Sequence, residues 1–382
     1  MTVDRSALQD AQRIVVKVGT AVLTEGGTAL DRAFMHDFAS SLSKLADDGR
    51  EIILVSSGSV AAGLDVLGMT ERPSDVTEQQ AAAASGQPLL MSSWRESFSV
   101  RNRPVAQLLV GRGDFDSRER YLNIRNCVAC LLGAGAVPIV NENDTVATDE
   151  ISLGDNDVLA AKLAVAVAAD ALVILSTVPG VLDADGNVVE AASTTHELAG
   201  LVRQEKSRQG RGGMSTKIEA GRIASLSGIH TVIGPGRPAD TIARIIAGES
   251  VGTMLRGARA RHVGRRLWIS TTATPAGTVE IDRGAMNALI DRGASLLAKG
   301  VTGVTGRFEV GDVLMIRDDR GREIGRGLSN LAAEELRQVI GCDSDQFEAR
   351  LGRQTHEEVI HRDNLAITLH PPGAEDGPAT PA

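Results

Sequence analysis

The first two thirds of the chain alternates short runs of Val, Ile and Leu with longer stretches rich in Ala and Leu. The short runs are typical of buried strands, and the longer stretches are typical of helices. Regular alternation favours an α/β fold with an open, mainly parallel sheet sandwiched by helices, because parallel strands need long crossover connections. The expected strands are residues 13–18, 51–56, 105–110, 137–140, 171–175 and 230–233. The expected helices are residues 31–48, 79–98, 119–132, 156–168, 216–227 and 239–247.

After about residue 248 the pattern changes to short strands punctuated by glycines, which indicates a small, β-rich second domain. Its strands are expected in RRLWIS, GTVEID, GDVLMIRDD and REIGRG, with a helix within residues 283–291. We therefore divide the chain into an α/β domain (1–252), a linker (253–262) and a β-rich domain (263–370). Residues 371–382 hold no large apolar side chain and are expected to form a disordered tail.

Composition excludes several classes of protein. The 382 residues include 40 Lys and Arg against 49 Asp and Glu, a net charge of −9, which disfavours a globally basic binder of nucleic acid or anionic membranes. Aromatic residues make up only 2%, so a base-stacking platform is not expected. The N-terminal stretch has no apolar signal core, and no apolar run approaches the roughly 18 residues of a membrane span. We expect a cytoplasmic protein.

The three cysteines include one C-x-x-C pair, Cys127 and Cys130. Such a pair can carry redox chemistry or supply half of a zinc site, but no second Cys/His pair matches it. The surrounding sequence YLNIRNCVACLLGAGA is typical of a helix with both thiols on one apolar face. Packing in the core is therefore the favoured interpretation.

Two glycine-containing turns follow expected strands early in the chain. In VVKVGTAVLT, a strand runs through Lys17 into a glycine, so the ammonium group can meet a phosphate; a solvated lysine is the alternative. In IILVSSGSVAAG, small residues around Ser57 precede an Ala-rich helix, where free backbone N–H groups can bind an anion. Helix capping by a serine is the alternative there.

The segment IVNENDTVATDEISLGDNDVLAAKLA gathers carboxylates and amides between an expected strand and helix. Asp144, Asn156 and Asp157 belong to this group, which suits an amino group, Mg²⁺ or the orientation of lysines. Stabilisation of the helix dipole is the alternative role for Asp157. In QGRGGMSTKIEAGRIA, Lys217 is expected in the first turn of a helix, which is unfavourable unless an anion binds the glycine-rich loop.

Together these four motifs supply two lysines, two small-residue turns and a carboxylate cluster. Phosphoryl transfer needs this set, because it depends on positioning and on positive charge around the transferred group. Neither a Cys–His nucleophile nor a G-x-S-x-G elbow is evident in the sequence.

The order and spacing of KVGTAVLT, VSSGSVAAG, VPIVNENDTVAT, GDND and GGMSTK resemble the glutamate 5-kinases of the amino-acid kinase family. The similarity runs from about Arg13 to His361. The later segment GASLLAKGVTGVTGRFEVGDVLMIRDDRGREIGRGLSN resembles the PUA domain that many bacterial members append. Two departures affect the nucleotide half of the site and bear on nucleotide affinity or preference more than on reaction type. Thr177 follows Ser176 where the family usually has Asp, with DADGNVVE replacing an Asp-Pro-Arg stretch, and Arg211 replaces the Thr of TGGM.

The resemblance implies ATP-dependent phosphorylation of the γ-carboxylate of L-glutamate to L-glutamyl 5-phosphate, the first step of proline synthesis. It also implies Mg²⁺, a homo-oligomer, and feedback inhibition by proline. By position, Lys17 and Lys217 would stabilise the moving phosphoryl group, and Asp157 would hold these lysines. Glutamate would be bound by Ser57, Asp144 and Asn156. ATP would be bound by Lys17, Ser176, Thr177, Gly212, Gly213, Met214, Ser215, Thr216 and Lys217.

Two other hypotheses stay open on the sequence. The first is a kinase for another acidic amino acid or its derivative, although carboxylates facing a free amino group argue against an acylated substrate. The second is an RNA-binding protein acting through the PUA-like domain. Residues 263–370 hold 14 Lys and Arg against 16 Asp and Glu, which is poor support for a phosphate-binding surface.

Under the family resemblance, the product is an acyl phosphate, which is labile in water. Contact with glutamyl phosphate reductase, the next enzyme of the pathway, is therefore a further expectation.

Overall fold

The computed structural model describes residues 4–146, 155–192, 213–258, 269, 274–343, 346–353 and 357–368. Its two compact units, Met1–Arg261 and His262–Ala382, are considered separately. Several predicted features lie outside the described residues: Arg211, Gly212, most of RRLWIS, part of the linker and the whole tail. Within the described residues, no helix is both long enough and apolar enough to cross a bilayer.

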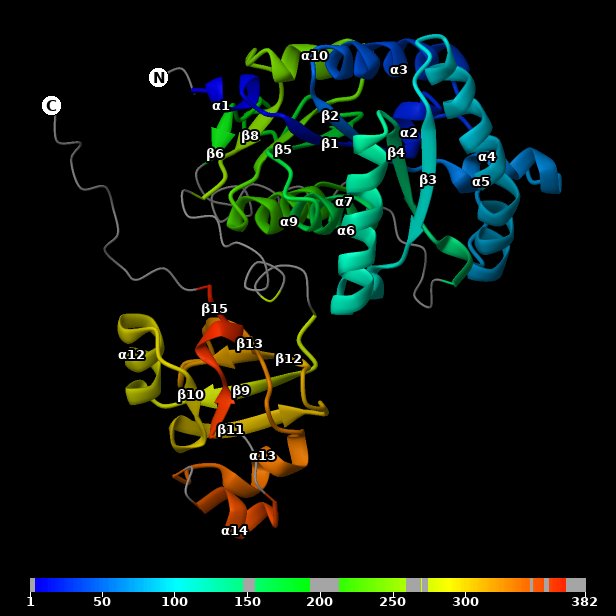
Figure 1. The fold of residues 1–382 in the computed structure, drawn as a ribbon. Coiled ribbons are helices and arrows are strands. Elements are labelled where there is room, and N and C mark those ends of the chain that lie inside the picture. The colour runs from blue at the N-terminus through cyan, green and yellow to red at the C-terminus, as the bar shows by residue number, and fades with distance from the viewer. Residues whose placement is uncertain are drawn as a thin grey trace, which may run out of the picture. The chain divides into compact units, whose positions relative to one another are not determined.

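The first unit is built on a sheet that has eight strands within the described residues (Figure 1). Neighbouring strands are parallel from β3 to β7, and β8 runs antiparallel to β7, which confirms the predicted mainly parallel sheet. The short strands β6 and β8 were not among the expected ones. In spatial order the strands are β3 (Val105–Val110), β4 (Val137–Glu142), β2 (Glu51–Ser56), β1 (Arg13–Val18), β5 (Ala171–Ser176), β7 (His230–Pro235), β8 (Thr253–Leu255) and β6 (Ala191–Ala192).

Helices cover both faces of this sheet, as predicted (Figure 1). One face carries α3 (Arg32–Asp47), α5 (Val76–Ser99) and α10 (Thr241–Ile246). The other face carries α6 (Arg118–Gly133), α7 (Asp155–Ala166) and α9 (Gly213–Leu226). Shorter elements are α1 (Ser6–Gln9), α2 (Thr20–Leu23), α4 (Ser59–Leu64), η1 (Asp65–Leu67), η2 (Arg112–Phe115) and η3 (Asp144–Val146).

Four of the nine aromatic residues pack together between α3 and α5. Phe34, Phe38, Trp94 and Phe98 form a continuous row with ring centroids 5.6, 6.3 and 6.1 Å apart. The buried Trp94 indole N–H donates to Ser56 Oγ at 2.9 Å. This hydrogen bond ties α5 to the carboxyl end of β2.

The alternation of side chains along β1 decides which face Lys17 occupies. Ile14, Val16 and Val18 pack in the core with α3 and α10. Lys17 lies between Val16 and Val18, so its side chain points to the opposite face of the sheet, toward α7 and α9. The carboxyl end of β1 lies beside those of β2 and β5, because Val18 pairs with both Ser56 and Leu175. The predicted site residues that follow these strands therefore share one edge of the sheet.

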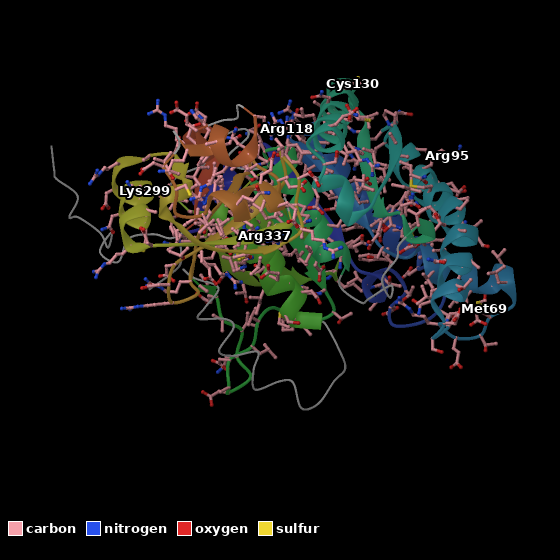
Figure 2. All side chains as sticks on the ribbon, turned by 90° about the horizontal axis from the view of Figure 1, so that it is seen from below. Met69, Arg95, Arg118, Cys130, Lys299 and Arg337 are labelled. Carbon is pink, nitrogen blue, oxygen red and sulfur yellow. The ribbon has the colours of Figure 1, made fainter. Side chains whose placement is uncertain are left out.

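The interpretation of Cys127 and Cys130 as core residues is wrong. Both side chains are exposed on α6, and Figure 2 shows Cys130 at the surface of the molecule. The buried stripe of α6 is formed instead by Tyr121, Ile124 and Val128, spaced three and four residues apart, and the two cysteines fall beside it.

The second unit is β-rich, as predicted, and its main sheet has the order β11-β9-β12-β13-β15. A core of aliphatic residues and two phenylalanines lies between this sheet and its helices. Strand β11 (VTGVTG) was not predicted, since its side chains are mostly half-buried or exposed and two of its residues are glycines. The elements are β9 (Gly277–Ile281), α12 (Arg283–Arg292), β10 (Leu296–Leu297), η5 (Ala298–Gly300), β11 (Val301–Gly306), β12 (Val313–Arg317), β13 (Glu323–Leu328), α13 (Ala333–Val339), α14 (Phe347–Leu351), β14 (Glu358–Ile360), η7 (Arg362–Asn364) and β15 (Leu365–Ile367).

Two glycines allow α4 and α5 to pack with their backbones in contact. A Cβ atom on Gly86 would overlap the carbonyl oxygen of Ser59, and one on Gly63 would overlap that of Ala82. Both collisions are with backbone atoms, which cannot turn away as a flexible side chain can. The position of α4, at the end of β2, therefore depends on these two glycines.

We expect Gly86→Ala to destabilise the protein by about 2–3 kcal/mol, because α4 must move away from α5 to admit the new methyl group. Gly133→Ala is the matched control, since a Cβ there meets no atom within 4 Å and the substitution is expected to be neutral or slightly stabilising. Thermal unfolding of the two variants measures the difference. Equal midpoints would contradict this account of the helix contact.

Candidate active site

Asp157 is the centre of a buried ionic cluster. Its Oδ1 lies 2.6 Å from Lys17 Nζ, and its Oδ2 lies 2.8 Å from Lys217 Nζ. Thr216 Oγ1 also donates to Oδ2, at 3.1 Å. The three charged residues come from β1, α7 and α9, and all three are buried. The structure therefore brings together the lysine pair and the aspartate that the sequence singled out.

The charges of this cluster do not cancel. Burial by itself raises the pKa of Asp157, but the two ammonium groups outweigh it and hold that pKa below the usual value, so the carboxylate is ionised. Burial also lowers the pKa of Lys17, an effect that Asp157 opposes and Lys217 reinforces. Two ammonium groups and one carboxylate leave one positive charge in a desolvated place. Such a place favours binding of an anion.

The prediction that Lys217 lies in the first turn of its helix is wrong. Helix α9 begins at Gly213, so Lys217 lies one turn further in, and its Nζ also donates to the Gly213 carbonyl oxygen at 3.1 Å. At that depth the helix dipole no longer opposes its charge as it would in the first turn. Gly213 and Ser215 are exposed, whereas Met214 and Thr216 are half-buried. Gly212 lies outside the described residues.

The remaining predicted nucleotide residues share the edge of the sheet with Lys17. Ser176 is the last residue of β5, and the exposed Thr177 follows it directly. The backbone N–H of Gly236, just after β7, donates to the Ser176 carbonyl oxygen at 2.6 Å. Because β5 is the neighbour of β1, Ser176 and Thr177 lie at the carboxyl end next to that of Lys17.

A second polar cluster adjoins the ionic one through Asn156, the residue before Asp157. Asn156 Nδ2 donates to Ser57 Oγ and to Asn141 Oδ1, at 2.9 Å each. The serine-cap alternative for Ser57 is wrong, since α4 is capped by Gly58 in a left-handed conformation with φ of 115°. The Ser57 hydroxyl instead accepts the hydrogen bond from Asn156, the neighbour of Asp157 in the chain.

Asp144 completes this second cluster from the η3 turn that follows β4. Ser59 Oγ donates to Asp144 Oδ2 at 2.9 Å. Burial raises the pKa of Asp144, and this effect is partly offset by the Ser59 hydrogen bond and by the positive charge of Arg72. A partly buried carboxylate of this kind can pair with the ammonium group of a ligand.

Two polar residues of this region, Ser59 and Gln87, were not predicted at all, and Asn141 was predicted only as a member of the group of carboxylates and amides, without a role of its own. Ser59 stands one residue beyond the Ser-Ser-Gly turn, and Asn141 begins the NEND motif, so their motifs give a signal. Gln87 lies in the middle of α5, where the sequence gives no sign of a site except for Pro88 inside the helix.

The described residues do not form a protein-only magnesium site. Among them, no group of three or more His, Cys, Asp or Glu side chains could hold a metal ion. Asp157 is already paired with two lysines. A magnesium ion held by one or two carboxylates together with the phosphates of a nucleotide is an arrangement that the described residues can accommodate.

Comparisons with known proteins agree along nearly the whole chain. Residues 12–235 match the amino acid kinase family, and residues 277–351 match the PUA domain. The chain is 43% identical over 370 residues to a glutamate 5-kinase of Ralstonia nicotianae, covering 95% of this chain and 99% of the relative. It is 43% identical over 362 residues to one of Thermus thermophilus, covering 94% and 97%. It is 44% identical over 370 residues to one of Pseudomonas syringae, covering 95% and 100%. The chain therefore belongs to the glutamate 5-kinases of the amino acid kinase family.

Proposed function

We propose that this protein transfers the γ-phosphoryl group of ATP to the γ-carboxylate of L-glutamate, giving ADP and L-glutamyl 5-phosphate, the first step of proline synthesis. The observation that carries the proposal is the buried lysine pair on Asp157, which lies beside the cluster of Ser57 and Asn156. The relatives named above support glutamate as the acceptor in preference to another acidic amino acid.

The chemistry needs little from the protein beyond positioning and charge. A γ-carboxylate is ionised at neutral pH and is itself the nucleophile, so the reaction needs no general base. Its oxygen attacks the γ-phosphorus of ATP, and the bond to the ADP oxygen breaks. Lys17 and Lys217 bind oxygens of the transferred group and offset the repulsion between two anions. Asp157 is a positioning residue, because it holds both ammonium groups in place.

The two ligands occupy the two sides of the lysine pair in this proposal. Ser57, Asp144 and Asn156 bind glutamate, with the Asp144 carboxylate facing its α-ammonium group. ATP is bound by Lys17, Ser176, Thr177, and the run Gly212, Gly213, Met214, Ser215, Thr216 and Lys217. Mg²⁺, carried by the ATP phosphates, supplies further positive charge.

The family also supports proposals about where the protein acts, how it assembles and what regulates it. We propose that it acts in the cytoplasm as a homo-oligomer, that proline inhibits it, and that it contacts glutamyl phosphate reductase, which would shorten the exposure of the acyl phosphate to water.

We expect Lys217→Ala to lower kcat by roughly 10²–10³-fold while the KM for glutamate changes by less than about threefold, because the lost charge acts on the transferred phosphoryl group. Steady-state assays of ADP release measure both constants. Lys44→Ala, which removes an exposed lysine on α3, is the control and should leave them unchanged. A raised KM with an unchanged kcat would contradict the assigned role.

Asp157→Asn should destabilise the protein by about 3–5 kcal/mol, because two buried ammonium groups then lose their counter-charge. ATP phosphates can replace that charge, so saturating ATP should raise the melting temperature of the variant more than that of the wild type. Thermal unfolding with and without ATP tests both statements. Asp47→Asn, at a half-exposed carboxylate paired with Arg101 and Arg103, should cost less than about 1 kcal/mol. A variant as stable as the wild type would refute the ionic role.

The raised pKa of Asp144 predicts a pH dependence of glutamate binding. Since the ionised form binds the α-ammonium group, kcat/KM for glutamate falls at acid pH as Asp144 is protonated. The Ser59 hydrogen bond favours the ionised form, so Ser59→Ala raises that pKa further and moves the acid limb to higher pH. The two profiles should converge at alkaline pH. Ser92→Ala, which removes a hydroxyl that donates to Glu96, is the control and should not move the acid limb of the pH profile. An unchanged acid limb in Ser59→Ala would refute the assigned role of Asp144.

A further inference from the structure

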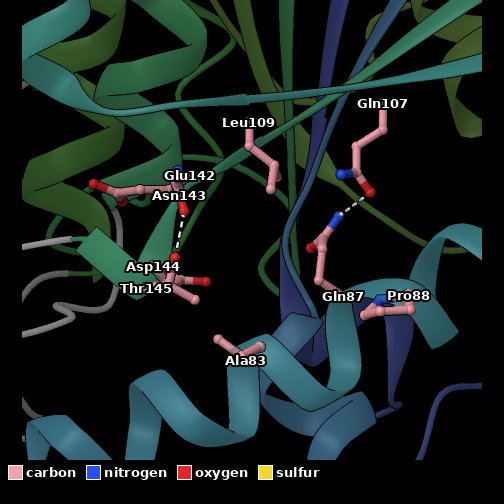
Figure 3. Close-up of a pocket in the computed structure, with 10 residues that line it drawn as sticks. Ala83, Gln87, Pro88, Gln107, Leu109, Glu142, Asn143, Asp144 and Thr145 are labelled. Carbon is pink, nitrogen blue, oxygen red and sulfur yellow. Dashed lines mark hydrogen bonds between the residues drawn. The ribbon is translucent and has the colours of Figure 1, made fainter.

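Four side-chain amides form a continuous hydrogen-bonded chain that runs from the outermost strand, β3, to Asn156 in the second polar cluster. Asn156 Nδ2 donates to Asn141 Oδ1 at 2.9 Å, and Asn141 Nδ2 donates to Gln87 Oε1 at 2.9 Å. Gln87 Nε2 donates to Gln107 Oε1 at 3.2 Å, as Figure 3 shows. We call Gln107, Gln87, Asn141 and Asn156 the amide chain. Its members come from β3, α5, β4 and α7.

All of these hydrogen bonds run in the same direction, and one backbone group sets that direction. The backbone N–H of Glu142 donates to Asn141 Oδ1 at 2.9 Å. A backbone N–H can only donate, so the Asn141 atom that faces it must be the oxygen. The nitrogen of Asn141 then faces Gln87, which must present its oxygen and turn its own nitrogen toward Gln107.

The buried position of the two middle members makes this direction costly to reverse. Asn141 is 2% exposed and Gln87 is 9% exposed, so neither can exchange its partner freely for water. Reversing one amide alone would set N–H groups against each other or leave a buried donor unpaired, at about 1–3 kcal/mol for each unpaired group. The distal member, Gln107, is exposed and borders a cavity of about 260 Å³, so water can satisfy its free N–H groups.

The direction of the chain decides which atom Asn156 offers to a ligand. Both hydrogens of its Nδ2 are used, one by Ser57 Oγ and one by Asn141 Oδ1. Its Oδ1 is buried and accepts no hydrogen bond from the part of the protein that the structure describes. A buried acceptor without a partner is unfavourable unless a ligand supplies the donor. An ammonium group supplies up to three.

We propose that Gln87 is a positioning residue that selects an acceptor substrate carrying an α-ammonium group. It accepts from Asn141, Asn141 in turn accepts from Asn156, and the Asn156 oxygen is thereby held toward the ligand. Without the Gln87 oxygen, the Asn141 nitrogen is buried and unpaired in its present orientation. Only the Glu142 N–H then still favours that orientation, so both asparagine amides are held less firmly. This inference rests on the proposed binding of glutamate by Asn156.

The test compares Gln87→Met, which keeps the length of the side chain and removes the acceptor, with Gln12→Met on the exposed residue before β1. We expect Gln87→Met to raise the KM for L-glutamate about tenfold, with kcat and the KM for ATP within about twofold of wild type. Gln12→Met should change none of these. Gln87→Leu serves as a second apolar variant should the methionine not pack. An unchanged KM for glutamate in a folded Gln87 variant would overturn the proposal.

Glutarate separates loss of the ammonium contact from a general distortion of the site, because it has the same two carboxylates and no amine. As a competitive inhibitor against L-glutamate, it should bind Gln87→Met and the wild type with inhibition constants within about twofold. If its inhibition constant rises as much as the KM for glutamate, Gln87 shapes the whole pocket and the proposal is overturned.

A double-mutant cycle with Asn156→Ala distinguishes failure of this inference from failure of the proposed function. We expect Asn156→Ala to raise the KM for glutamate, and Gln87→Met to add less than about twofold in that background. Additive effects would overturn the action of Gln87 through Asn156 and leave the role of Asn156 intact. If Asn156→Ala leaves the KM unchanged, the assignment of Asn156 to glutamate fails, and the proposal built on it fails with it.

Discussion

The charge of one buried carboxylate, Asp157, governs the arrangement of the site. It holds two lysines that would otherwise repel each other, and it does so where burial limits screening by water and salt. Because the three charges sum to plus one, the cluster keeps the two lysines together and still attracts anions. Phosphoryl transfer between two anionic substrates needs such a positive charge at the point where they meet.

Much of the fold and of this cluster could be predicted because both follow from periodicity and from strand ends. Buried strands appear as short aliphatic runs, and polar residues after parallel strands gather at one edge of the sheet. Lys17 stood out at the end of a strand and Asp157 in the polar segment after another strand, whereas Lys217 stood out through the glycine-rich loop before its helix. The resemblance to the family assigned Asp157 to the lysines and Ser57, Asp144 and Asn156 to glutamate. The structure adds the hydrogen bonds that link Ser57 to Asn156 and Ser59 to Asp144.

Other features depend on tertiary packing that a local pattern does not record. The cysteines of α6 share a face with each other, but the buried face begins one residue away. Lys217 was correctly assigned to a helix, but the sequence did not show that the helix begins at Gly213. Lys217 therefore lies beyond the first turn, where the helix dipole opposes its charge less. Gln87 looks like any polar residue in an Ala-rich helix, and only the positions of Asn141 and Gln107 give it a role.

The ionic cluster joins parts of the chain that are far apart in sequence: Asp157 is 140 residues after Lys17 and 60 before Lys217. No segment shorter than 201 residues, from Lys17 to Lys217, contains all three charges. The cluster therefore exists only when β1, α7 and α9 are packed together. A chain in which these three elements have not yet assembled lacks the cluster, so catalytic activity requires that this part of the first unit is folded.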